Sequence, residues 1–219
     1  MIKLQLDPTK EYGIVLEGGG AKGAYQVGAW AALLEAGIKI KGIAGTSVGA
    51  LNGALMCMDD LREAEKLWDN ISWSQVMDID DTLIEQWKAR DFSSLSLHEL
   101  LAEGKRILKD RGLDITPLKQ LIERTIDEDK IFQSDKEFFV STISLSDRKP
   151  LIVNMKEVAE GEMKDMLLAS AYLPGFKRER LGGKLYADGG GANNVPVDVL
   201  ADRGYKDIIV IRIYGLGYD

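Results

Sequence analysis

The segment from Ile43 to Leu51 constrains the fold of this chain more than any other. It contains the pattern G-x-S-x-G, with a short apolar run before it and small and apolar residues after it. This order is typical of a strand that ends in a sharp turn and continues as a helix, with the serine at the tip. Gly45 and Gly49 permit a tight turn and close packing because they lack a Cβ atom. Ser47 is therefore a candidate nucleophile at a helix N-terminus, and the alternative is a serine that only caps the helix.

Apolar strand patterns and helical patterns alternate in the early part of the chain. The predicted elements there are strands at 12–16 and 40–44 and helices at 24–35 and 48–58. This alternation favours a parallel sheet with right-handed crossovers. Further strands are expected at 137–143, 151–153, 184–186 and 208–213, with a helix at 158–170. The prediction is a single α/β domain over residues 1–219, a three-layer sandwich with a mainly parallel central sheet and helices on both faces.

A segment of about residues 59–135 interrupts this alternation with helical patterns. Helices are expected at 61–68, 96–109 and 117–126, the last with Thr116 as its N-cap and Pro117 at its first position. Because no Gly-, Ser- or Pro-rich linker flanks the segment, we interpret it as a helical insertion rather than a second domain. Three of the four tryptophans lie within it, where aromatic side chains pack in a core or, alternatively, form a lid or a membrane-facing surface.

Charge and composition exclude several functional classes. A net charge of −7 argues against general nucleic-acid binding, which requires a basic surface. The single histidine, His98, rules out a zinc site built from several histidines, and a Ser-His-Asp triad would depend on that residue alone. No part of the sequence has the ligand spacing of an EF-hand calcium site, and we expect no metal. The lone Cys57, the lack of an apolar signal-peptide core after Met1 and the lack of a membrane-length apolar run predict a cytoplasmic protein.

A glycine-rich cluster from Gly18 to Gly23 follows the first predicted strand. Its glycines satisfy G-x-G-x-x-G, a pattern that also marks dinucleotide-binding folds. That interpretation needs an acidic residue at the end of the second strand, about 20 residues further on, to bind a ribose. Residues 43–47 contain no acidic residue, and this weakens the dinucleotide-binding interpretation. Alternatively, successive backbone N–H groups before a helix form an anion-binding concavity, which opposite Ser47 would be an oxyanion hole for acyl transfer.

A nucleophilic serine also needs a base. His98 is a poor candidate because it lies in the middle of an amphipathic helical pattern. Asp188 follows a predicted strand and precedes Gly189 and Gly190, whose small size would let the loop pass close to another element. The loops after parallel strands meet at one edge of a sheet, so Asp188 could accept the serine proton directly, and burial should raise its pKa towards the working pH. The alternative is an aspartate that only forms a turn or caps a helix in a glycine-rich loop, without a chemical role.

Three motifs, in their order along the chain, resemble those of the patatin-like phospholipase family: E-G-G-G-A-K-G at 17–23, G-T-S-V-G at 45–49 and D-G-G at 188–190. The resemblance extends to S-A-Y-L-P-G-F at 170–176 and N-V-P-V at 194–197, covers residues 12–213 and matches the insertion only in outline. It implies the α/β fold of that family, a Ser–Asp dyad and no cofactor. Lys22 stands where the family often has arginine, whose planar guanidinium a lysine lacks.

Residue by residue, the resemblance implies that Ser47 is the nucleophile and Asp188 the base. The elbow glycines are Gly45 and Gly49, and Gly189 and Gly190 complete the D-G-G motif. The oxyanion hole would lie in the cluster formed by Gly18, Gly19, Gly20, Ala21, Lys22 and Gly23.

The resulting expectation is a serine acyl hydrolase that cleaves carboxylic ester bonds of phospholipids or related lipids through an acyl-enzyme on Ser47. The insertion is expected to influence substrate choice and to contact a membrane surface transiently, so the protein would be cytoplasmic and peripheral at membranes. Its acidic net charge would oppose binding to anionic membranes. The alternatives are a dinucleotide-binding Rossmann-type domain and a non-catalytic, lipid-binding member of the same fold.

Overall fold

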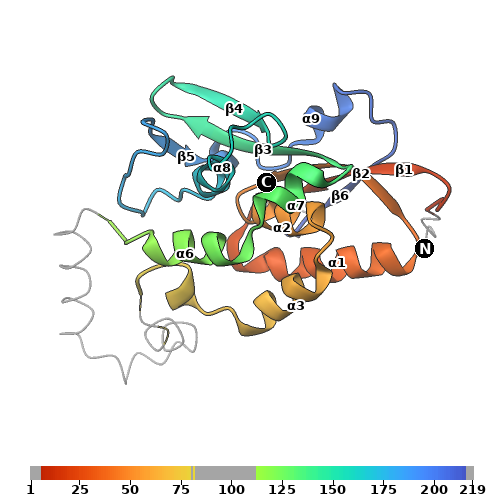
Figure 1. Cartoon of the computed structure of the whole chain (residues 1–219), viewed down its shortest axis with the longest axis horizontal. Coiled ribbons are helices and arrows are strands. Elements are labelled where there is room, and N and C mark those ends of the chain that lie inside the picture. Colours follow the sequence, from red (N-terminus) through yellow and green to blue (C-terminus); the bar gives the residue numbers. More distant parts are fainter. Residues whose placement is uncertain (1–5, 80, 82–111, 216–219) are drawn as a thin grey trace.

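A computed structural model describes residues 6–79, 81 and 112–215 of the chain (Figure 1). The helix expected at 96–109, and His98 within it, lie outside these residues. The described part of the chain contains a central sheet of six strands: β1 (Glu11–Leu16), β2 (Lys39–Thr46), β3 (Glu137–Ser144), β4 (Lys149–Asn154), β5 (Tyr186–Asp188) and β6 (Ile208–Ile211).

The strands lie in the order β4-β3-β2-β1-β6, and β5 pairs with the end of β3 that β2 does not reach. The strands β1, β2, β3 and β6 are parallel, whereas β4 and β5 run antiparallel to β3. The mainly parallel sheet predicted from the sequence is therefore confirmed, with two antiparallel strands added beside β3.

The described helices are α1 (Ala24–Glu35), α2 (Val48–Cys57), α3 (Leu61–Asn70), α6 (Thr116–Thr125), α7 (Glu128–Gln133), α8 (Met163–Ser170) and α9 (Val197–Ala201). They cover both faces of the sheet, with α9 on the side opposite α1, α2 and α3 (Figure 1). Ile14 packs into the larger apolar cluster on one face, and the next residue, Val15, packs with Val199 of α9 on the other. This alternation follows from the two-residue period of a strand. The three-layer arrangement is thus the predicted one.

The helix α2 lies in the interior, as its almost uniformly apolar sequence predicts. Nine of its ten residues are buried. A helix packed on all sides is a rigid support for the residue at its N-terminus, here Ser47. Among residues 6–79, 81 and 112–215, no helix is long and apolar enough to cross a membrane.

Several boundaries differ from the expectations, such as that of β6, which ends at Ile211 instead of residue 213, and three of the differences have a local cause. Thr116 is the first residue of α6 rather than its N-cap, since Asp114 Oδ1 accepts the Thr116 N–H at 2.7 Å and supplies the capping acceptor. The helix expected from residue 158 begins only at Met163, because Gly161 has φ +83°, outside the helical range. β5 covers Tyr186–Asp188 instead of 184–186, since a tight turn closed by a bridge occupies residues 181–184.

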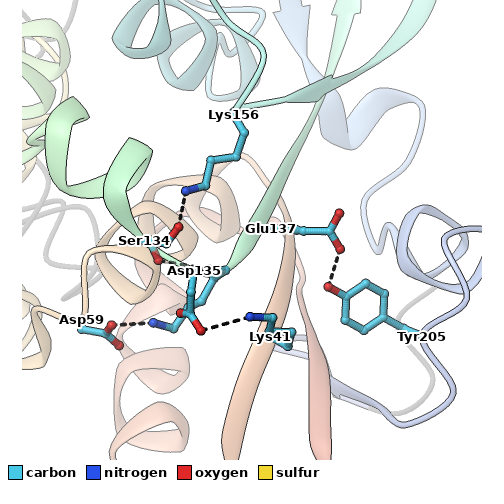
Figure 2. Close-up of polar contacts among 8 residues, drawn as sticks. Lys41, Asp59, Ser134, Asp135, Glu137, Lys156 and Tyr205 are labelled. Atoms are coloured by element: carbon cyan, nitrogen blue, oxygen red, sulfur yellow. Dashed lines mark hydrogen bonds and ion pairs between the residues drawn. The ribbon is translucent and has the colours of Figure 1, made fainter.

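Polar contacts secure the edge of the sheet at which β2 and β3 begin (Figure 2). Lys41 pairs with Asp135 at 3.0 Å, and the Tyr205 hydroxyl donates to the Glu137 carboxylate at the start of β3. Lys156 donates to three carbonyl oxygens at the end of α7, where its positive charge also stabilises the carboxyl end of the helix. These contacts hold the amino-terminal ends of the strands, and the opposite edge carries the glycine-rich loops.

Candidate active site

Ser47 stands at a sharp turn between β2 and α2. Its backbone has φ 54° and ψ −123°, a strained combination for a residue other than glycine. A Cβ atom at Gly45 would lie 2.3 Å from Gly49 O, and a Cβ atom at Gly49 would lie 2.3 Å from Leu16 O. Both glycines are thus required by close backbone contacts. Ser47 occupies the N-cap position of α2, but its side chain makes no capping hydrogen bond to the helix.

The pairing of β3 with two different strands brings Asp188 to Ser47. The strand β2 runs parallel to β3, and its last pair is Thr46 with Ser141. The strand β5 runs antiparallel to β3 and ends on the pair of Asp188 with Thr142, the next residue along β3. The two strands therefore meet end to end beside β3, and Ser47 and Asp188 lie at the junction.

The Asp188 carboxyl group is largely enclosed. Its Oδ1 accepts the Gly190 N–H at 2.7 Å, whereas Oδ2 is buried and accepts no fully formed hydrogen bond within the described part of the chain. Burial raises the pKa of this carboxyl group, and the Ser47 hydroxyl and the Gly190 amide oppose the rise. A buried carboxylate with one oxygen left unpaired beside a serine is suited to take up a proton.

The glycines after Asp188 allow this loop to approach β3, as expected from the sequence. They form the short 3-10 helix η3 (Gly189–Gly191). A Cβ atom at Gly189 would lie 2.1 Å from Ser141 O, and one at Gly190 would lie 2.9 Å from Asp188 Oδ1. Larger residues would displace the carboxyl group from the junction.

The first glycine cluster lies against the nucleophile. A Cβ atom at Gly18 would be 3.3 Å from Ser47 Cβ. The rest of the cluster forms the 3-10 helix η1 (Gly20–Gly23), in which Gly20 has φ +59°, and α1 follows directly. The Gly18 N–H donates to Asn194 O at 3.1 Å, so the amides available to an oxyanion begin with Gly19.

Ser170 is a site residue to which the sequence reasoning assigned no role. It is fully buried at the end of α8. Its Oγ accepts the Ser47 N–H at 2.8 Å and donates to Ser141 O at 2.7 Å. The hydroxyl thus ties the strained turn to β3. The only sequence signal was its place at the start of the S-A-Y-L-P-G-F stretch.

Asn194 joins the first glycine cluster to the D-G-G loop. Its backbone oxygen accepts the Gly18 N–H, and its side-chain amide donates to Gly18 O at 3.2 Å. A Cβ atom at Gly18 would lie 2.4 Å from Asn194 Oδ1, and a Cβ atom at Gly190 would lie 3.0 Å from the same oxygen. The Asn194 side chain therefore hydrogen-bonds the first glycine cluster and packs closely against the D-G-G loop.

Glu17 anchors the chain after β6 beneath the same cluster. Its buried carboxylate accepts the N–H groups of Ile213 at 2.6 Å and Tyr214 at 3.1 Å, and Arg212 lies 3.4 Å away. The Lys22 ammonium lies 3.6 Å from the centroid of the Tyr214 ring, in cation–π geometry. The side chain of Lys22 is thereby held by this chain's own aromatic residue.

The described residues contain no group of three or more histidine, cysteine or carboxylate side chains that could hold a metal ion. The candidate groups in this site are the Ser47 hydroxyl, the Asp188 carboxyl group and backbone amides.

Comparisons with known proteins give a matching family model and several related sequences. The family model described as patatin-like phospholipase matches residues 14–201. Neuropathy target esterase sws of Drosophila melanogaster is 27% identical over 208 residues, which cover 92% of this chain and 13% of that protein. Patatin-like phospholipase domain-containing protein 7 of Rattus norvegicus is 29% identical over 210 residues, with 91% and 13% covered. The chain thus spans about an eighth of the length of these relatives.

Two further matches are more limited. Lysophospholipase nte1 of Aspergillus terreus is 58% identical over 50 residues, which are 23% of this chain and 3% of that protein. Among solved structures, VipD from Legionella pneumophila superposes with a TM-score of 0.54 at 16% identity, over 84% of this chain and 47% of that chain. At that identity the match supports the fold alone.

Proposed function

The chain belongs to the patatin-like phospholipase family, and on this premise we propose that it hydrolyses carboxylic esters of lipids with Ser47 as nucleophile and Asp188 as general base. The observation that carries the proposal is the junction of β2 and β5, which sets a strained serine beside a buried, partly unpaired carboxyl group. Asp188 also caps η3, but it does so through Oδ1, which leaves Oδ2 to accept the proton of Ser47.

In the first step, Ser47 Oγ attacks the ester carbonyl carbon and its proton passes to Asp188 Oδ2. The carbonyl oxygen becomes an oxyanion that the amides of Gly19 and Gly20 stabilise. Collapse of this intermediate breaks the carbon–oxygen bond to the leaving alcohol, which takes the proton from Asp188. An acyl group then remains on Ser47.

In the second step, water attacks the acyl-enzyme and gives its proton to Asp188. Collapse of the second oxyanion releases the free fatty acid, and Ser47 Oγ recovers the proton. The same carboxyl group thus serves as base and acid in turn. Its raised pKa suits both duties, because an ordinary aspartate would be a weak base.

The substrates we propose are phospholipids, lysophospholipids or related lipid esters. Support comes from the names of the relatives, which include a lysophospholipase, a neuropathy target esterase and phospholipase domain-containing proteins. We further propose that the protein works in the cytoplasm and reaches its substrate by transient contact with membranes. No cofactor takes part in the proposed reaction.

Labelling with a fluorophosphonate probe tests the dyad. The probe should form an adduct on Ser47, located by mass spectrometry, and Ser47→Ala should abolish it. Asp188→Asn should slow labelling by about 10²–10⁴-fold, the usual contribution of a positioned base. The matched control is Asp202→Asn, an exposed aspartate after α9, which should label at the parent rate.

The possible results separate the alternatives. Absence of an adduct on folded parent protein would remove the proposal in favour of a non-catalytic, lipid-binding role. Equal labelling of Asp188→Asn and parent would retain the nucleophile and reject the base. Where labelling behaves as expected, release of fatty acid from phospholipid and lysophospholipid esters identifies the substrate class.

A further inference from the structure

A loop beside the proposed dyad carries an exposed apolar tip. The loop covers residues 171–185 and links α8 to β5 (Figure 1). Leu173 is 41% exposed, and Pro174 beside it is exposed as well. The loop borders the site because the Asp188 N–H donates to Tyr172 O at 2.9 Å. An exposed leucine therefore lies next to the residue that holds the base.

Buried groups hold this tip in a defined conformation. Tyr172 and Phe176, on either side of it, are buried, and their rings pack edge to face with centroids 6.2 Å apart. The Tyr172 hydroxyl donates to Lys177 O and accepts the Glu179 N–H at 2.7 Å. The Phe176 N–H closes the turn on Leu173 O at 3.0 Å. Leu173 is thus presented on a preformed turn, which lowers the entropic cost of burying it elsewhere.

Basic residues follow the tip directly. The segment 177–184 holds one acidic residue, Glu179, and four basic residues, Lys177, Arg178, Arg180 and Lys184. Lys184 pairs with Asp147 at 2.8 Å and Lys177 pairs with Asp114 at 3.9 Å, whereas both arginines are exposed. The two exposed arginines outnumber Glu179, so the loop carries a small net positive charge in a chain whose net charge is −7.

We propose that this loop is the surface by which the protein docks on an anionic lipid bilayer, with Leu173 among the acyl chains and Arg178 and Arg180 at the phosphate groups. The proposal rests on the proposed function, because docking here would hold Ser47 beside the lipid ester. An apolar side chain flanked by basic ones matches both parts of such a surface, the apolar interior and the negative head groups.

The overall acidity of the chain does not oppose this orientation. Charges further away than the Debye length, about 8 Å at physiological salt, are largely screened at the loop. The two arginines would meet the surface first, and the acidic residues outside the loop and its two ion pairs would stay in solution. The sequence-based expectation that acidity disfavours anionic membranes treats the charge as uniform, whereas the fold places basic charge beside the site.

Cosedimentation with lipid vesicles tests the proposal, with Ser47→Ala as the parent so that no lipid is consumed. Binding should be stronger to vesicles of phosphatidylcholine mixed with phosphatidylserine than to phosphatidylcholine alone. Arg178→Gln and Arg180→Gln should each weaken binding to the mixed vesicles about fivefold, the usual contribution of one basic residue at such a surface. Leu173→Ser should weaken it by a similar factor, about fivefold, through lost apolar burial.

Matched controls come from the other end of the molecule. Leu34 at the end of α1 is 42% exposed, so Leu34→Ser removes an equally exposed leucine. Lys39 is exposed at the start of β2, so Lys39→Gln removes an equal charge. Both control variants should bind vesicles as the parent does.

Several results would overturn the proposal. They are equal binding to neutral and anionic vesicles, a failure of the parent to bind anionic vesicles, and loop variants that bind like the controls. Binding to soluble poly-glutamate without binding to vesicles would indicate an acidic protein partner instead. Fluorophosphonate labelling of the same loop variants with native Ser47, measured without lipid, reports on the dyad alone. Labelling without docking rejects only the docking surface, and docking without labelling rejects only the proposed catalysis.

Discussion

The variant Ser170→Ala tests whether the Ser170 hydroxyl positions the nucleophile in addition to stabilising the fold. In Ser170→Ala, the Ser47 N–H and Ser141 O each lose their hydrogen bond to Ser170 Oγ in a fully buried place. Loss of a buried hydrogen bond typically costs about 1–3 kcal/mol, so we expect the free energy of unfolding to fall by about 2 kcal/mol. The lost bond also holds Ser47 in its strained conformation. A loss of about 1.4 kcal/mol in the stability of that conformation, relative to others of Ser47, would slow attack by the Ser47 hydroxyl about tenfold.

Ser144→Ala provides the matched control. Ser144 is also fully buried on β3, and its Oγ likewise accepts a backbone N–H, that of Asp147 at 3.1 Å. It donates to the Asp147 carboxylate at 2.7 Å. The two variants remove the same number of hydrogen bonds, but only Ser170 contacts the nucleophile. Urea unfolding should therefore show similar losses of stability in both.

The rate of fluorophosphonate labelling at saturating probe should fall about tenfold in Ser170→Ala and stay at the parent value in Ser144→Ala. The affinity for the probe should be the same in both, because both hydroxyls are fully buried and hydrogen-bonded within the protein. Equal labelling rates in the two variants would refute the argument and reduce Ser170 to a stabilising residue.

The remaining predictions concern the base and the glycines. Labelling of Ser47 should rise with pH as Asp188 loses its proton, with a midpoint above the usual aspartate pKa because burial raises the pKa of this carboxyl group; a rate that is flat across that range would reject the assignment. A raised pKa in the folded state means that ionisation destabilises the fold, so stability is lost as pH rises through this range. Asp188→Asn should then resist urea better than the parent at neutral pH, and the difference should vanish in acid, where the parent is protonated. Gly45→Ala should prevent folding, since its Cβ atom would lie 2.3 Å from Gly49 O. By contrast, a Cβ atom at Gly28 in α1 would have nothing within 4 Å, so Gly28→Ala should stabilise the protein by about 0.5–1 kcal/mol. Thermal unfolding of both variants checks this contrast, and the argument fails if Gly45→Ala melts like the parent.

Local signals in the sequence predicted the layered fold well. The strand, glycine turn and helix around Ser47 were expected within a few residues, because a glycine pair and a change of apolar period act over short distances. The same holds for the first strand and α1. Errors lie where a single neighbour decides the boundary: Asp114 supplies the cap of α6, and Gly161 delays the start of α8.

The supporting contacts of the candidate site had no comparable signal. Ser170, Asn194 and Glu17 act through partners far away in the sequence, such as Ser47, Gly18 and Tyr214. A buried serine or asparagine looks the same in the sequence whether it holds a nucleophile or fills a turn. Only the folded chain brings each of these side chains to its partner.

The sequence by itself determined the chemical groups and the local turns: a serine between two glycines, an aspartate before two more, and a glycine cluster ahead of a helix. The tertiary structure decided that they meet. The strands β2 and β5 approach one another from opposite directions along β3 and end at adjacent residues, Ser141 and Thr142. That register depends on the packing of the whole sheet between its helix layers, which no short segment of sequence encodes.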